Sequence, residues 1–151
     1  MIDVESIKKL REETGAGVLE VKQALEASNG DFQAARKELA LKGISKAAKK
    51  ADRMTKDGLV HSYIHMGGKV GSMVLVACET DFLAKTEDFK NLCHEIALQA
   101  CAQEYPDIET LLAAEYIRDP GKKIMDLITE VTAKVGEKIE LKNFARFAVN
   151  Q

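Results

Sequence analysis

Apolar residues in the first 44 positions recur at helical spacing in three short segments. The first, ESIKKLREETG, carries Ile7 and Leu10 on one face and ends at Gly15, a residue type that often follows the last turn of a helix. The second segment is GVLEVKQALEAS. The third, FQAARKELALKG, follows Asp31, which is placed to cap its N-terminus. The pattern predicts a three-helix module over residues 1–44.

The second of these helices begins with two neighbouring apolar residues, Val18 and Leu19. Neighbours on a helix point in different directions, and a module of this size has only a small core. We therefore expect that the two side chains are not both buried and that one of them faces outward.

Residues 45–56, SKAAKKADRMTK, differ in composition from the segments on either side. They include five cations, one acid and few large apolar residues. A basic, solvated linker, helical or not, is the simpler interpretation, and a contact with the ribosome or with RNA is the alternative.

From residue 58 the apolar period changes to two, which is typical of strands. The segments GLVHSYIHM and VGSMVLVACE flank Gly67 and Gly68 and predict a β-hairpin that turns at these two glycines. The C-terminal segment EKIELKNFARFAVN alternates in the same way. It predicts a final strand, one face of which comprises Ile139, Leu141, Asn143, Ala145, Phe147 and Val149.

Two helices are predicted between the hairpin and the final strand. The first begins after Thr86, an N-cap residue, and its buried stripe comprises Phe89, Leu92, Cys93, Ile96, Ala97, Ala100 and Cys101. The second lies within residues 119–136, and the acidic residues 104–119 between them are expected to be irregular. Residues 57–151 would thus form one domain. The predicted fold class is α+β, with a small antiparallel three-stranded sheet packed with helices.

Composition indicates a folded chain, and its net charge is too small to attract a strongly charged partner. Hydrophobic residues make up 46% of the 151 residues and the net charge is −2, so no direct contact with nucleic acid or an anionic membrane is expected. No apolar run approaches the roughly 20 residues that span a bilayer. The first residues, MIDVESIKKL, do not resemble a secretory signal. We expect a cytoplasmic chain of bacterial type, or a matured organellar one.

Candidate catalytic and metal-binding residues are few. Cys93 and His94 are adjacent on a helix and point apart, so they do not form a nucleophile–base pair with each other. His61 and His65 share one face of a strand but lie about 13 Å apart at 3.3 Å per residue, too far for one metal ion. The glycines of TGAGVLE and GGKVGS do not complete a nucleotide-binding motif. No cofactor or metal is expected.

Cysteine usage points to a reducing compartment. The three cysteines, Cys78, Cys93 and Cys101, are odd in number and cannot form a closed disulfide framework. We expect reduced, buried thiols.

The connection CETDFLAKTEDF, residues 78–89, places a carboxylate and a large aromatic ring side by side, in Asp81 and Phe82. In one interpretation Asp81 caps a turn and Phe82 closes the core beneath the next helix, as aromatic side chains beside helices commonly do. In the other, Phe82 faces outward and anchors a partner protein. The periodicity does not decide between them.

Four separated segments resemble the elongation factor Ts family. They are LREETGAGVLEVKQAL, GDFQAARKELALKGISKAAKKA, GLVHSYIHMGGKVGSMVLVACETDFLAKTEDF and YIRDPGKKIMDLITEVTAKVGEKIELKNFARF, and together they cover nearly the whole chain. The resemblance implies a ubiquitin-associated-like three-helix module followed by a dimerisation-type core domain, as in the short members of the family.

The resemblance also implies a function. Members of the family bind elongation factor Tu with its GDP and promote GDP release by disturbing the magnesium and phosphate site, so that GTP can load. They are exchange factors that act by binding and not by bond chemistry. Carried over by position, the residues that reach the magnesium site are Thr80, Asp81, Phe82 and Leu83. The residues of the N-terminal module that touch the partner are Leu10, Val18 and Leu19.

Some features depart from the family pattern or leave other functions open. Leu83 stands where a valine is usual, and Val18 and Leu19 stand where many members have methionine. Because the chain has one core subdomain, a second copy of itself is a candidate for the remaining contact with elongation factor Tu, as a homodimer. Two other classes are an adaptor built on the three-helix module and a cysteine-dependent enzyme that uses Cys78 or Cys93.

Overall fold

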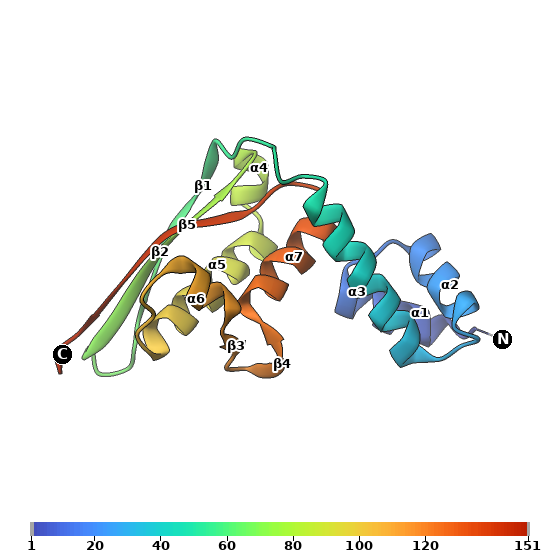
Figure 1. Cartoon of the computed structure of the whole chain (residues 1–151), viewed down its shortest axis with the longest axis horizontal. Coiled ribbons are helices and arrows are strands. Elements are labelled where there is room, and N and C mark those ends of the chain that lie inside the picture. Colours follow the sequence, from blue (N-terminus) through green and yellow to red (C-terminus); the bar gives the residue numbers. More distant parts are fainter. Residues whose placement is uncertain (1, 151) are drawn as a thin grey trace. The chain divides into compact units, whose positions relative to one another are not determined.

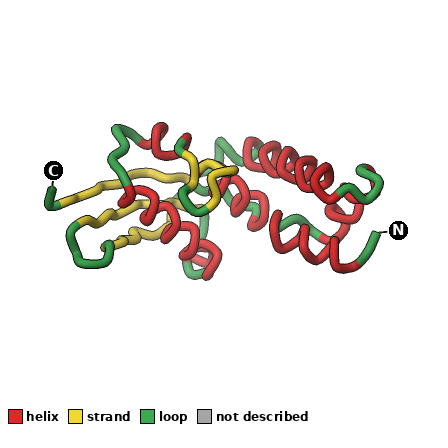
Figure 2. The backbone as a smooth tube through the Cα atoms, turned by 90° about the horizontal axis from the view of Figure 1, so that it is seen from below, coloured by secondary structure: helices red, strands yellow, loops and turns green. Residues whose placement is uncertain are grey.

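The computed structural model describes residues 2–150 (Figure 1). Its helices are α1 (Val4–Thr14), α2 (Val18–Ala27), α3 (Phe32–Ala48), α4 (Asp81–Ala84), α5 (Glu87–Ala102), α6 (Ile108–Ala113) and α7 (Ile124–Val135). Its strands are β1 (Asp57–Ile64), β2 (Val70–Cys78), β3 (Glu115–Tyr116), β4 (Asp119–Lys123) and β5 (Glu140–Ala148). Figure 2 shows only helices in the N-terminal part, whereas the part that follows combines helices with strands.

The chain folds as two compact units. Unit 1 comprises the described residues as far as Asp52 together with Thr129–Gly136. Unit 2 comprises Arg53–Ile128 together with the described residues from Glu137 onward. The domain boundaries expected at residues 44 and 57 stay a prediction.

The N-terminal helices begin and end as local chemistry predicts. Asp3 accepts a hydrogen bond from the Ser6 backbone N–H at 2.7 Å, and Asp31 accepts one from the Ala34 N–H at 3.0 Å. Gly15 follows α1 in the left-handed conformation, with φ of 70°, which glycine adopts at little cost. The predicted caps of the first and third helices are confirmed.

Helix α3 is longer than the sequence pattern predicts. The buried core of unit 1 is small and comprises Leu10, Val21, Ala24, Leu25, Ala35 and Leu39. Above this core α3 continues through Gly43 to Ala48 and takes in the start of the predicted linker. A Cβ atom at Gly43 would lie 3.4 Å from the Cβ atom of Ala133. Gly43 therefore lies inside the helix, at a close contact with the last turns of α7.

Unit 2 is built on an antiparallel sheet with strand order β1–β2–β5. Strands β1 and β2 pair from Asp57 opposite Cys78 to Ile64 opposite Gly71. The turn between them contains Gly67 and Gly68, both at positive φ. The hairpin and its turn are confirmed, and with them the α+β fold class with a three-stranded antiparallel sheet.

Strand β5 contains a bulge that the sequence pattern does not show. Leu75 pairs with Asn143 but its neighbour Val76 pairs with Leu141, so Lys142 is an extra residue in β5. One extra residue moves every following side chain to the opposite face. Leu141 is buried, whereas Phe147 and Val149 are exposed. The prediction that all six alternating residues share one face is therefore wrong beyond the bulge.

Helix α5 covers one face of the sheet (Figure 1). Thr86 caps it by accepting a hydrogen bond from the Phe89 N–H at 3.2 Å. All seven residues of the predicted stripe are buried: Phe89, Leu92, Cys93, Ile96, Ala97, Ala100 and Cys101. This stripe is confirmed, and it forms the centre of the unit 2 core.

Residues 104–119 are ordered rather than irregular, and a polar side chain organises them. The segment contains α6 and strand β3, and β3 pairs with β4. Gln99, buried on α5, donates to the Tyr105 hydroxyl at 2.8 Å and to the Glu115 carbonyl at 3.0 Å. Its side-chain oxygen accepts from the Ile117 N–H at 3.1 Å. The contacts with Glu115 and Ile117 join residues 16 and 18 positions apart, which is why local periodicity did not predict the segment.

The core of unit 2 gives a direct test of the fold. Phe89 is fully buried, and its replacement by alanine should lower the free energy of unfolding by about 3–5 kcal/mol. Phe82→Ala is the matched control, because this ring is 80% exposed and its loss should change stability by less than about 0.5 kcal/mol. Urea unfolding of the two variants beside the wild type measures both. Equal losses of stability in the two variants would contradict the difference in burial between Phe89 and Phe82.

Candidate functional site

The candidate site is the corner at which strand β2 gives way to helix α4. Thr80 is the N-cap of α4, and its hydroxyl accepts a hydrogen bond from the Leu83 N–H at 3.3 Å. Helix α4 is a single turn, so its side chains point in different directions. Leu83 and Ala84 are buried, whereas Asp81 and Phe82 are exposed. The corner is therefore held from inside by Leu83 and presents a carboxylate and a ring to the outside.

Phe82 does not close the core. Its side chain is 80% exposed, although an aromatic ring of this size normally gains free energy by leaving water. The interpretation that places Phe82 beneath the helix is therefore wrong. An exposed ring on a short, capped helix has the geometry of an anchor for another protein.

Asp81 is also exposed, and the cap of this turn is Thr80. Its carboxylate makes an ion pair with Lys85 at 3.3 Å. Both side chains are more than half exposed, so water screens the pair and it contributes little to stability. Asp81 can therefore exchange Lys85 for a group on a partner at small cost.

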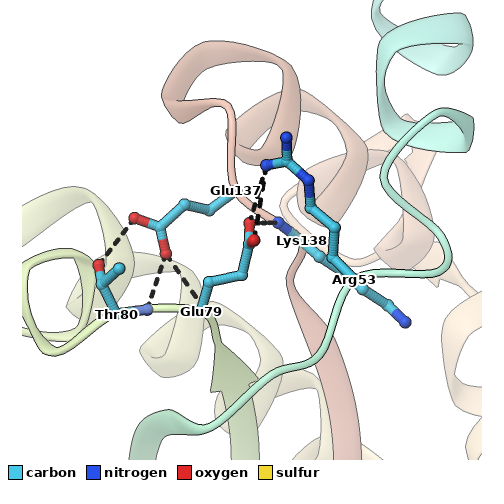
Figure 3. Close-up of polar contacts among 5 residues, drawn as sticks. All are labelled: Arg53, Glu79, Thr80, Glu137 and Lys138. Atoms are coloured by element: carbon cyan, nitrogen blue, oxygen red, sulfur yellow. Dashed lines mark hydrogen bonds and ion pairs between the residues drawn. The ribbon is translucent and has the colours of Figure 1, made fainter.

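Glu137 holds the backbone of the corner, although it lies far from it in sequence (Figure 3). Its carboxylate accepts hydrogen bonds from the Glu79 N–H at 3.1 Å and the Thr80 N–H at 2.9 Å. It also accepts one from the Thr80 hydroxyl at 2.8 Å. Hydrogen bonds to a charged acceptor are stronger than those between neutral groups. Sequence analysis missed Glu137, because nothing local marks it as a partner of Thr80.

Glu79 makes the reciprocal contact with the backbone next to Glu137. Its carboxylate accepts from the Lys138 backbone N–H at 2.7 Å and from Arg53 Nη1 at 3.3 Å. Glu79 and Glu137 therefore each hold the backbone beside the other, and all four residues belong to unit 2. Figure 3 shows these bonds joining three separate segments of the chain.

The cysteine next to the corner does not have the properties of a nucleophile. Burial, with the Glu137 charge as the second cause, raises the pKa of the Cys78 thiol to about 11, and burial raises the pKa of Cys93 to about 12. Both thiols are then protonated at neutral pH, whereas the reactive form of cysteine is the thiolate. The structure therefore does not favour a cysteine-dependent enzyme.

The three residues predicted for partner contact in unit 1 differ in exposure. Leu10 is fully buried in the core, while Val18 is 50% and Leu19 68% exposed at the start of α2. The expectation that Val18 and Leu19 are not both buried is confirmed. Leu10 belongs to the buried core of unit 1, and the assignment of all three residues to a partner contact stays a prediction.

Lys46 and Arg53, two cations of residues 45–56, make ion pairs with other residues that the structure describes. Lys46 bonds Glu20 at 2.5 Å within unit 1, and Arg53 bonds Glu79 at 3.3 Å within unit 2. These contacts give both residues a role inside the fold.

A histidine pair is a second feature that sequence analysis missed. His61 Nε2 on β1 lies 3.3 Å from His94 Nδ1 on α5, and the Tyr63 hydroxyl lies 3.1 Å from His65 Nδ1. The sequence argument considered His61 with His65 along one strand, whereas helix α5 brings His94 to His61. Among residues 2–150 no group of three or more His, Cys, Asp or Glu side chains is arranged to hold a metal ion.

Comparison with known proteins gives a consistent result. A family model described as Elongation factor TS matches residues 79–151, a range that begins at the first residue of the corner. The Elongation factor Ts of Syntrophomonas wolfei is 38% identical, over all of this chain and 92% of its own length. That of Caldanaerobacter subterraneus is 39% identical over 97% of this chain and 96% of its own length. That of Petrotoga mobilis is 38% identical over 99% of each.

These matches, together with the α+β fold, place the chain among the elongation factors of protein biosynthesis. More particularly, the chain belongs to the elongation factor Ts family. The alignment to the Syntrophomonas wolfei relative spans 196 positions against 151 residues here, so that relative contains stretches without a counterpart in this chain. No helix in the described part of the chain has both the length and the apolar composition to cross a bilayer.

The histidine pair predicts how stability depends on pH. Burial, with the nearby His94 as the second cause, lowers the pKa of His61 below its usual 6.5. The unfolded chain therefore binds more protons than the folded chain just below pH 6.5, and the free energy of unfolding should fall as pH falls through this range. Urea midpoints at about pH 7.5 and about pH 5.5 measure the change.

His61→Gln removes the group that titrates and should make this pH dependence shallower. His65→Gln, at an exposed histidine one residue beyond the end of β1, is measured beside it for comparison. A slope that is the same in the wild type and in His61→Gln would contradict the assignment to His61.

Proposed function

We propose that this chain binds elongation factor Tu with its GDP and promotes GDP release, so that GTP can load. The observation that carries the proposal is Phe82, an 80% exposed ring at a corner where the Glu137 carboxylate accepts three hydrogen bonds, two from backbone N–H groups and one from the Thr80 hydroxyl. Membership of the elongation factor Ts family supports it. The proposed place of action is the cytoplasm, in a bacterial-type translation system.

The proposed mechanism is physical displacement at the magnesium site of the partner. Elongation factor Tu would hold GDP through phosphate contacts and a magnesium ion that bridges phosphate and protein. Phe82 would fill an apolar gap beside that site, and Asp81 would leave Lys85 to bond neighbouring polar groups. Elements that hold the magnesium ion would shift, and the binding of GDP would weaken.

One aromatic anchor can supply the free energy that faster GDP release requires. A buried anchor contributes about 2–4 kcal/mol to a protein complex, and each 1.4 kcal/mol of barrier reduction is about a tenfold gain in rate. The exchange factor and GDP would then oppose each other's binding by the same coupling free energy. No bond is made or broken in this scheme, so the activity is exchange by binding, without a cofactor.

The other predicted residues have supporting roles in this proposal. Thr80 caps α4 and Leu83 anchors it inward, so that both set the direction of Phe82. Val18 and Leu19 would make a separate contact with the nucleotide-binding domain of elongation factor Tu, and Leu10 would contribute from the buried core of unit 1. An adaptor function of the three-helix module is the competing proposal, and pull-down of ubiquitin or ribosomes in preference to elongation factor Tu would favour it.

The exchange proposal is tested at the two exposed residues of the corner. Phe82→Ala should slow the release of a fluorescent GDP from elongation factor Tu by about tenfold or more, because a 2–4 kcal/mol anchor is lost. Asp81→Ala should also slow it, by a smaller factor. Stopped-flow fluorescence measures both rates.

Met66→Ala is the control for removal of an exposed apolar side chain, since Met66 is 89% exposed at the hairpin turn of unit 2. It should release GDP at the wild-type rate. Full exchange activity in both Phe82→Ala and Asp81→Ala would remove the corner from the mechanism.

We further propose that the outer face of the sheet binds a second copy of the chain. The bulge in β5 turns apolar side chains outward, and the exposed ones on this face are Val60, Ile64, Met73, Leu75, Phe147 and Val149. Part of the face forms an apolar groove of about 400 Å³. An apolar sheet face that packs on its own copy gives a closed twofold dimer, and contiguous apolar patches on soluble chains commonly mark such contacts. The second copy would supply the contact that a single core subdomain lacks.

The dimer proposal predicts a lower molecular mass in solution when a charged residue is introduced on the outer face of the sheet. Phe147→Glu should convert a two-chain species into a single chain, because the carboxylate would be buried without a partner. Light scattering coupled to size-exclusion chromatography measures the mass. Val4→Glu is the control, because Val4 is 80% exposed on α1 in unit 1 and its replacement should leave the dimer intact. A wild-type chain that runs as a monomer would contradict the proposal.

A further inference from the structure

We propose that Glu137 is a positioning residue for Phe82, and that exchange activity depends on this carboxylate although it does not itself reach the partner. The inference rests on the proposed function and deepens it. It concerns which residue of this chain sets the direction of the exposed ring.

Glu137 satisfies donors that the fold would otherwise leave without a partner. Strand β2 ends at Cys78, and helix α4 begins at Asp81. The backbone N–H groups of Glu79 and Thr80 therefore lie between the strand ladder and the first helical turn, where neither provides an acceptor. Glu137 accepts from both, at 3.1 Å and 2.9 Å (Figure 3). One carboxylate thus fixes two successive peptide units at the point where the chain changes direction.

The same carboxylate also fixes the cap of α4. The Thr80 hydroxyl donates to Glu137 at 2.8 Å and accepts from the Leu83 N–H at 3.3 Å. Because the Thr80 hydroxyl donates its hydrogen to Glu137, its oxygen lone pairs remain available for the Leu83 N–H. The bond to Glu137 therefore orients the Thr80 hydroxyl for capping. An unbroken series of hydrogen bonds therefore runs from Glu137 through Thr80 to the residue that follows Phe82.

Helix α4 is too short to keep its direction by itself. It is a single turn of four residues, closed by hydrogen bonds from the Ala84 N–H to Thr80 at 3.4 Å and from the Lys85 N–H to Asp81 at 3.2 Å. A first helical turn is unfavourable without outside support, because it fixes several residues for few bonds. Burial of Leu83 holds the turn on the core, and Glu137 holds its start. Without Glu137 the turn would stay attached but would present Phe82 over a range of directions.

Each of the two stretches of chain that make up unit 2 begins at a residue bonded to the corner. The chain passes into unit 2 at Arg53 and again at Glu137. Arg53 bonds the Glu79 carboxylate at 3.3 Å, and Glu137 bonds the Glu79 and Thr80 backbone. Within unit 2, the segment that carries Phe82 is therefore bonded to two other segments of the chain.

The test compares Glu137→Ala and Glu137→Gln with the wild type in GDP release from elongation factor Tu. Rates are measured over a range of factor concentrations, which separates the maximal rate from the concentration at half saturation. Glu137→Ala should lower the maximal rate by about fivefold and change half saturation by less than about twofold, since orientation acts on the step after binding. Glu137→Gln keeps an acceptor oxygen for the two N–H groups and should retain most of the wild-type rate.

A double-mutant cycle with Phe82→Ala separates positioning from general damage. If Glu137 acts through Phe82, the double variant should be no slower than Phe82→Ala alone. Glu95→Ala is the matched control: it removes a half-buried carboxylate of unit 2 that bonds Tyr116 at 2.6 Å and Arg118 at 2.8 Å, away from the corner. This control should leave the rate unchanged. Circular dichroism and urea unfolding confirm that each variant is folded.

The outcomes distinguish this inference from the proposed function. A slow Phe82→Ala beside a folded Glu137→Ala at the wild-type rate would overturn the inference alone. Losses that multiply in the double variant would overturn it as well, because they would show that Glu137 acts elsewhere. A wild-type rate in Phe82→Ala would refute the proposed function and the inference together.

Discussion

The packing of α5 against one face of the β1–β2–β5 sheet is the constraint from which the rest of unit 2 follows. Seven residues of α5 are buried in this contact, and the inner residues of β2, Ser72, Val74 and Val76, are buried beneath them. Because β2 must stay under α5 to its last residue, the chain has to turn between Cys78 and Glu87. Helix α4 fills this turn. In this turn Leu83 and Ala84 are the residues that face the core, and Phe82 is left outside it.

Features that depend on neighbours in sequence could be predicted, and features that depend on distant partners could not. The caps at Asp31 and Thr86 and the turn at Gly67 and Gly68 are local, and the stripe on α5 is a simple periodicity. The order of residues 104–119 depends on Gln99, a polar side chain inside that stripe. No pattern along the chain marks a glutamine as an organiser of a segment that follows it.

At the candidate site, too, local features could be predicted and those that depend on distant residues could not. From the sequence, exposure of Asp81 and Phe82 was one of two alternatives. The periodicity did not favour it, because an aromatic residue beside a helix is buried more often than it is exposed. The resemblance named Leu10 and Leu83 beside Phe82 but did not separate buried supports from accessible contacts, which the structure does. Glu137 lies at the far end of unit 2 in sequence, and only the three-dimensional fold brings its carboxylate to Thr80.

The bulge at Lys142 indicates how an exposed apolar face on the β1–β2–β5 sheet could arise from one small change in the sequence. A strand end that alternates apolar and polar residues can be core or surface, and a one-residue shift in pairing decides which. Gain or loss of a single codon in β5 would therefore exchange the inner and outer sets at its end, without any change in the residues themselves. A family with this sheet could acquire or lose an assembly surface by one insertion or deletion, far more readily than by replacing each exposed side chain in turn.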